Sequence, residues 1–70
     1  MMKFTDRELE IMKYLCLENK EIGEILYITP KTVQTHIVNI RQKVGASSRA
    51  SMVVELIKAG ILKIEEVVTN

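Results

Sequence analysis

The chain has 70 residues, of which 47% are hydrophobic and 27% charged, with a net charge of +1 and a single cysteine, Cys16. This length allows one domain with a thin core, and the composition is too apolar for a disordered chain. A lone cysteine excludes an internal disulfide, and no apolar run approaches the roughly 18 residues of a membrane span. We therefore expect one soluble, cytoplasmic domain over residues 1–70, with a core at about 4–62, a C-terminal tail at 63–70 and Cys16 in the core.

Charge is unevenly distributed along the chain. Residues 1–24 contain four basic and six acidic residues, and residues 55–70 contain two basic and three acidic residues. Residues 25–54 contain four basic residues and no acidic one, so this segment carries +4. Such local polarity suits a surface that faces phosphates, and the alternative is a run of solvated charge without a partner.

A first helix is predicted from Asp6 to about Leu17. Thr5 and Glu8 have the spacing of a capping box, which satisfies two backbone N–H groups at a helix start. Phe4 and Leu9 flank the cap as a hydrophobic staple. The apolar face expected for this helix comprises Ile11, Met12, Leu15 and Cys16.

Asn19 can cap a short second helix that runs to about Leu26. Its apolar residues are expected on one face: Ile22, Ile25 and Leu26. Gly23 inside this helix costs roughly 1 kcal/mol relative to alanine, so it indicates close approach of another backbone, which we expect to be the third helix. The alternative is a locally weak helix.

Thr29-Pro30 predicts the start of a third helix, because threonine is a good cap and proline is favoured at the first helical position. Four apolar residues then recur at helical spacing and fall within about 60° of one another on a helical wheel: Val33, Ile37, Ile40 and Val44. They predict a narrow buried stripe, and Gly45 is expected to end the helix.

A last helix is predicted from Ser47 or Ser48 to about Ala59, with Gly60 at its end and Ile61 and Leu62 packing back. Its polar strip is narrow and comprises only Ser51, Glu55 and Lys58. The apolar arc is wider than one small core can cover, so part of this helix is expected to meet another protein.

The second and third helices, separated by the short turn 27–29, form a pair of the kind in which the second helix enters the DNA major groove. The side of the third helix opposite the buried stripe contains no carboxylate. Glutamine can bond an adenine edge, threonine and valine can touch a thymine methyl, and lysine or arginine can pair with phosphates. This pattern favours a DNA-binding face over an ordinary solvated one.

Several segments together resemble the LuxR/GerE-type helix-turn-helix domain, over Phe4 to Leu62. They are Thr5–Ile11, Asn19–Gly23, Ile28–His36, Ile40, Lys43–Gly45 and Ser48-Arg49. The resemblance implies an all-α fold of four helices, with the third helix in the major groove and the fourth in a symmetric homodimer. It also implies a bacterial transcription regulator that binds double-stranded DNA and needs no cofactor and no metal.

The resemblance assigns roles to matching positions. Gln34, Thr35 and Val38 match positions that meet base edges. Positions near the phosphate backbone are matched by Lys31, Thr32, His36, Arg41 and Lys43, of which Lys43 is the strongest match. Glu10 and Arg49 match an ion pair between the first helix and the start of the fourth, which makes Arg49 part of the scaffold. The residues expected at the dimer interface are Ala50, Val54, Ile57 and Ile61.

The sequence departs from the family pattern at two places. The link between the first two helices is two residues shorter than usual and lacks the common glycine. Gln34 and Val38 replace residues that are basic in many relatives, which lowers the expected non-specific affinity for DNA.

Two alternatives share the fold. One is a protein-interaction module that pairs with another LuxR-type regulator and binds little DNA itself. The other is a fragment similar to the promoter-reading end of a sigma factor, which would contact RNA polymerase. Catalysis is not expected, because His36 is the only histidine, no serine or cysteine lies at a helical spacing that would pair it as a nucleophile, and there is no glycine-rich phosphate loop. The apolar Val67 and Val68 favour a complete small regulator over a domain cut from a larger chain.

Overall fold

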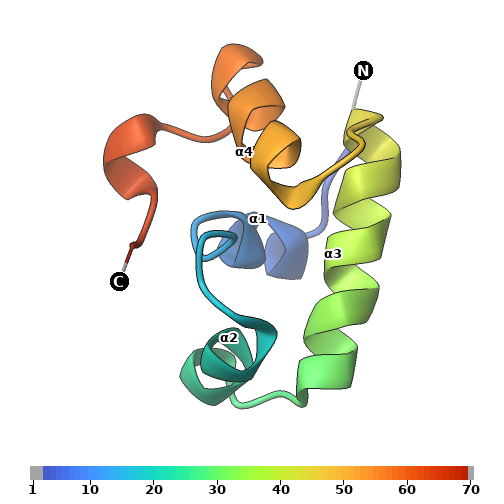
Figure 1. Cartoon of the computed structure of the whole chain (residues 1–70), viewed down its shortest axis with the longest axis vertical. Coiled ribbons are helices and arrows are strands. Elements are labelled where there is room, and N and C mark those ends of the chain that lie inside the picture. The colour runs from blue at the N-terminus through green and yellow to red at the C-terminus, as the bar shows by residue number, and fades with distance from the viewer. Residues whose placement is uncertain (1–2, 70) are drawn as a thin grey trace.

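A computed structural model describes residues 3–69. It contains helices α1 (Asp6–Met12), α2 (Asn19–Leu26), α3 (Pro30–Val44) and α4 (Arg49–Lys58), followed by the short 3-10 helix η1 (Ile64–Glu66) (Figure 1). Residues 3–69 contain no strand, so the expectation of an all-α, four-helix helix-turn-helix domain is confirmed. Within the same residues, no helix combines the length and apolar character that crossing a bilayer requires.

Helix α3 is the element against which the others pack. It contacts α1, α2 and α4, and in Figure 1 it runs along one edge of the molecule with the other helices on its inner side. Val33, Ile37 and Ile40 are buried, and Val44 is half-buried against the core. The predicted stripe is therefore the face by which α3 is attached, and its opposite face is left open.

The core draws buried side chains from every helix. The stripe of α3 packs in one cluster with Ile11 and Met12 of α1, Ile22 of α2, and Met52 and Leu56 of α4. Full burial of such a side chain contributes about 1.5–3 kcal/mol. A chain of this size has few core residues, so each one contributes a large share of the free energy of unfolding.

Helix α1 ends earlier than expected, at Met12, and the chain then turns through residues 13–17. In these turns the N–H of Tyr14 donates to the carbonyl of Ile11 at 2.9 Å, and the N–H of Leu17 donates to that of Tyr14 at 2.9 Å. The tighter winding shifts the phase of the side chains, so Leu15 and Leu17 are buried. The expectation that Cys16 packs in the core was wrong, because it lies between them and is exposed.

The other helix ends follow local signals. Thr5 and Glu8 form the expected capping box, and Thr29 caps α3 with Pro30 in its first turn. Gly45 ends α3 with a φ of 77°.

Helix α2 differs slightly from the expectation, because Glu18 rather than Asn19 is its cap. Ile25 was expected on the buried face of α2, but it is 43% exposed, since α3 covers only the side that carries Ile22.

Gly23 is buried where the turn between α2 and α3 comes closest to α2. A Cβ atom at this position would lie 2.5 Å from the carbonyl oxygen of Ile28 and 3.5 Å from the nitrogen of Pro30. The predicted close approach is thus confirmed, and the approaching backbone is the turn together with the first residue of α3. The chain reverses here through Tyr27, which has a φ of 59° and ends α2 in a left-handed conformation.

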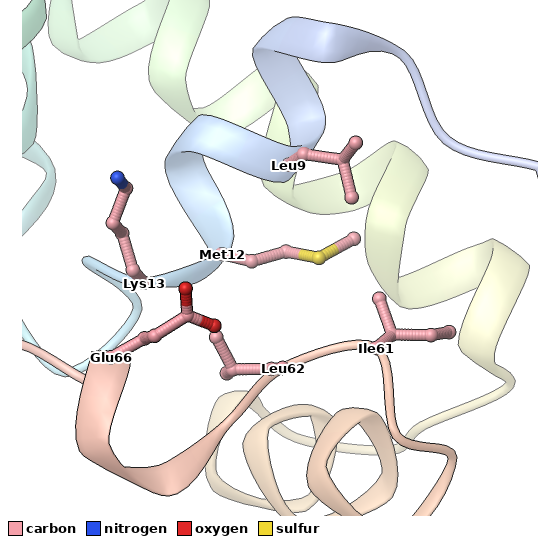
Figure 2. Close-up of a pocket in the computed structure, with 6 residues that line it drawn as sticks. All are labelled: Leu9, Met12, Lys13, Ile61, Leu62 and Glu66. Carbon is pink, nitrogen blue, oxygen red and sulfur yellow. The ribbon is translucent and has the colours of Figure 1, made fainter.

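The C-terminal segment returns to α1. Leu62 is buried, Val67 is half-buried, and the N–H of Val68 donates to the carbonyl of Lys13 at 2.8 Å. A cavity of about 160 Å³ remains between this segment and α1, and Figure 2 shows Met12 crossing it toward Ile61. Its other lining residues are Leu9, Lys13, Leu62 and Glu66. The packed part of the chain therefore continues past α4.

Replacing Gly23 by alanine is expected to lower the free energy of unfolding by about 1–3 kcal/mol, because the new methyl group meets backbone that cannot move away cheaply. Helix propensity alone predicts the opposite sign, a gain of about 1 kcal/mol. Urea denaturation measures the difference. Glu24→Ala is the matched control on the exposed side of α2 and should stay within about 0.5 kcal/mol of the wild type. A Gly23→Ala variant that is more stable than the wild type would contradict the close approach.

Candidate nucleic-acid interface

The outer face of α3 is open to solvent. Gln34 and Thr35 are exposed, and Val38 is half-buried. The 15 residues of α3 include no acidic side chain. The residues predicted to meet base edges therefore lie together on a surface that is largely open to solvent.

The residues predicted to lie near phosphates differ in solvent exposure and in whether they already have a partner within the protein. Lys31 and Arg41 are exposed, and neither has a carboxylate partner within residues 3–69. His36 is half-buried. Thr32 is exposed, but its hydroxyl lies 2.9 Å from that of Thr29 in the N-terminal cap of α3. Two unpaired positive charges therefore lie toward opposite ends of the helix.

Lys43 has partners inside the protein. Its Nζ donates to Oε1 of Glu8 at 2.7 Å and lies 5.5 Å from the centre of the Phe4 ring. The side chain of Lys43 is 37% exposed, whereas that of Glu8 is 3% exposed. Lys43 thus ties the end of α3 to α1. Its expected role as the strongest phosphate contact stays a prediction, and a substitution there would disturb the fold as well.

Glu8 is a buried carboxylate with its charge compensated. Burial by itself raises its pKa, but the hydrogen bonds from Lys43 and from the Thr5 backbone, with the charge of Lys43, bring the pKa below its ordinary value. The same oxygen, Oε1, accepts from the N–H of Thr5 at 2.8 Å and from Lys43. The charged form of Glu8 therefore stabilises both the start of α1 and its contact with α3.

The expected ion pair between Glu10 and Arg49 was wrong. Glu10 is exposed and lies 3.9 Å from Arg7 on its own helix. Arg49 instead donates to the carbonyl of Leu15 at 2.7 Å, to that of Leu17 at 2.7 Å, and to the side chain of Asn19. Burial lowers the pKa of Arg49. The guanidinium satisfies the carbonyls of the short link that follows α1, so Arg49 is part of the scaffold, as expected, through different partners.

Asn19 joins this scaffold to α3, which the sequence did not indicate. Its Oδ1 accepts from Nη1 of Arg49 at 2.8 Å, and its Nδ2 donates to Oε1 of Gln34 at 2.8 Å. Side chains thereby link the first residue of α4, the first residue of α2 and the N-terminal third of α3. Sequence pattern indicated Asn19 only as a helix cap, since the residues involved lie 15 and 30 positions apart.

The residues expected at a dimer interface lie on α4 and just beyond it. Ala50 and Val54 are exposed, and the exposed fraction of Val54 is 48%. Ile57 and Ile61 are half-buried and pack partly against the core. This side of α4 therefore presents apolar surface to solvent in the single chain.

Glu8→Gln is expected to lower the free energy of unfolding at pH 7 by about 1–3 kcal/mol, because a charge-assisted bond in a buried site is weakened. The folded-state pKa lies below the ordinary value of 4.5, so this stabilisation is complete above that value and disappears as the pH falls through the folded-state pKa. The variant should thus lose less stability than the wild type on acidification. Denaturation at a series of pH values measures this, with Glu10→Gln as the exposed control. Parallel curves for the wild type and Glu8→Gln would contradict the assignment.

Comparison with known proteins identifies the family. The family described as "Bacterial regulatory proteins, luxR family" matches residues 2–56. Transcriptional regulatory protein DegU of Brevibacillus brevis is 44% identical over 62 residues, which cover 86% of this chain and 26% of DegU. Spore germination protein GerE of Bacillus subtilis is 42% identical over 62 residues, which cover 86% of this chain and 84% of GerE.

Transcriptional regulatory protein LiaR of Bacillus subtilis is 54% identical over 55 residues, which cover 71% of this chain and 25% of LiaR. The chain thus spans about a quarter of the length of DegU and of LiaR. No solved structure gives a significant match. The family match covers most of the chain, so the chain belongs to the luxR family of bacterial regulatory proteins.

Proposed function

We propose that the chain is a sequence-specific regulator of transcription that binds double-stranded DNA as a dimer, with α3 in the major groove. The observation that carries the proposal is the outer face of α3, which is exposed, free of carboxylates and held in place from the opposite side by its buried stripe. The names of DegU and LiaR, which describe transcriptional regulatory proteins, support the same function.

The dimensions of α3 suit the groove. A helix of 15 residues is about 22 Å long, and the major groove is about 12 Å wide, enough to admit an α-helix. Gln34 can reach a base edge through its amide, and Thr35 and Val38 present methyl groups suited to the methyl of thymine. These three side chains are therefore assigned to base reading.

Positive charge at both ends of α3 supports contact with the DNA backbone. Lys31 and Arg41 are exposed and free to pair with phosphates, with Thr32 and His36 beside them. Lys43 contributes less positive charge to this surface, because it is paired with Glu8. The segment 25–54 has four basic residues and no acidic one, so the attraction is local although the whole chain carries only +1.

Base reading and phosphate contact predict different effects in a binding experiment. Selection from random duplexes at two salt concentrations first identifies the preferred site. Gln34→Ala should then weaken binding by about 1–3 kcal/mol at one base position and leave the other positions unchanged. Lys31→Ala should weaken all sequences alike and reduce the salt slope by about 1.

Lys58→Ala is the control for charge, because Lys58 is exposed on α4 rather than on α3. Equal losses across all base positions for Gln34→Ala and Lys31→Ala would refute the assigned roles. A wild-type chain without duplex affinity at any salt concentration would favour the protein-interaction module instead.

Dimerisation through α4 would place two copies of α3 on one face of the duplex. Ala50, Val54 and Ile57 lie on one side of the wheel of α4, Ile61 follows just beyond the helix, and this surface is partly exposed and apolar. A two-fold symmetric pair reads two half-sites about one helical turn apart, so the selected sites should be palindromic.

Val54→Glu is expected to give a monomer under conditions in which the wild type is a dimer, because a two-fold axis brings two added charges into one apolar contact. Val54 is better suited than Ile57, which also packs on the core. Ala59→Glu introduces the same side chain at an exposed position on the opposite side of the wheel and should leave the mass unchanged. Sedimentation measures both variants, and an unchanged mass for Val54→Glu would exclude this interface.

A further inference from the structure

We propose that Asn19 is a positioning residue that orients the side-chain amide of Gln34, so that Gln34 offers its NH₂ group to an acceptor atom on a base edge. The inference rests on the proposed function, in which Gln34 reads a base. The inference specifies that the NH₂ group of the Gln34 amide contacts the base, and that Asn19, which lies outside α3, sets this orientation.

The orientation of the Asn19 amide is set by Arg49, whose guanidinium can only donate hydrogen bonds. Its three bonds to Leu15, Leu17 and Asn19 hold the group in one place between α4 and the link after α1. The atom of Asn19 that faces Nη1 of Arg49 at 2.8 Å must therefore be the acceptor, Oδ1. The chemistry of arginine thus fixes which way the Asn19 amide lies.

The same reasoning continues to Gln34. With Oδ1 of Asn19 on Arg49, the NH₂ group of Asn19 faces α3 and can only donate. It donates to Oε1 of Gln34 at 2.8 Å. The carbonyl oxygen of Gln34 is thereby turned toward Asn19, with one of its two lone pairs occupied, and Nε2 on the other side of the amide is the group left for a ligand.

A donor at this position changes the expected base preference. An unconstrained glutamine pairs with adenine, using its oxygen for N6 and its nitrogen for N7. A glutamine whose oxygen is turned toward Asn19 presents its NH₂ donors, and these favour guanine, which offers two acceptors, O6 and N7, in the major groove. Cytosine, which offers only the N4 donor there, is disfavoured. The geometry therefore points to guanine on the strand that Gln34 contacts.

Asn19→Asp tests this relay by reversing it. An aspartate still accepts from Arg49, but its second oxygen can only accept, so Gln34 must turn its NH₂ toward Asp and leave Oε1 free. Oε1 accepts from a base donor, so the preference at the contacted base should shift from guanine toward cytosine or adenine by about three- to tenfold. Affinities are measured for four duplexes that differ only at the base pair to which Gln34→Ala becomes indifferent.

The ratio between the four duplexes is the readout, because the added negative charge of Asp weakens binding to all of them alike. Asn19→Ala should relax the preference without reversing it. In a Gln34→Ala background, Asn19→Asp should leave the ratios unchanged. A purely structural role of Asn19 would lower all four affinities together in every background.

A second readout does not need DNA. In ¹⁵N spectra of the free protein, the side-chain NH₂ resonances of Gln34 should shift on Asn19→Asp, because this group changes from facing solvent to donating to a carboxylate. Circular dichroism checks that the variant is folded. Unchanged Gln34 resonances would overturn the relay itself.

The outcomes separate the inference from the proposed function. A wild type that binds specific duplexes, with ratios that do not change in Asn19→Asp, overturns the inference and leaves the proposed function intact. A wild type that binds no duplex overturns the proposed function and, with it, the base-reading role of Gln34. A preference for guanine that turns toward cytosine or adenine in the variant supports both.

Discussion

The structure depends on α3 being attached along one narrow stripe. Val33, Ile37 and Ile40 are buried against all three other helices, and this contact leaves most of the circumference of α3 without a protein neighbour. A wider buried face would leave fewer residues of α3 available to a ligand. A narrower one would not fix the angle between α3 and the other helices. The pair of Lys43 and Glu8 adds a polar attachment at the far end of α3, where the apolar stripe is only half-buried at Val44.

Polar side chains satisfy the backbone carbonyl groups of the short link between α1 and α2. The link from α1 to α2 is short, and its carbonyls at Leu15 and Leu17 cannot be satisfied by a continuing helix. Arg49 satisfies them from α4, and Asn19 extends the same network to α3. A single guanidinium therefore connects α4, the link after α1 and α2, and the surface proposed to read bases is positioned partly by a residue that lies on another helix.

Local signals in the sequence predicted the fold well, and tertiary contacts were predicted poorly. Thr29-Pro30 and Gly45 set the ends of α3 because caps depend only on neighbouring residues, and the stripe of α3 followed from its period. The predicted end of α1 and the predicted burial of Cys16 were wrong, since a capping box marks where a helix begins but not where it ends. The assignment of Arg49 to Glu10 failed, and the bond between Asn19 and Gln34 was missed, because such partners depend on packing across 15 or more residues. The contacts of the outer face of α3 with DNA stay predictions.

The position of the C-terminal segment has a practical consequence. The N–H of Val68 donates to the carbonyl of Lys13, and in Figure 1 the segment that contains η1 lies across the molecule from α3. A fluorescent label or a biotin attached to the exposed residue 69 would lie away from the outer face of α3. The protein can thus be immobilised on a sensor surface by this end with that face directed toward the solution.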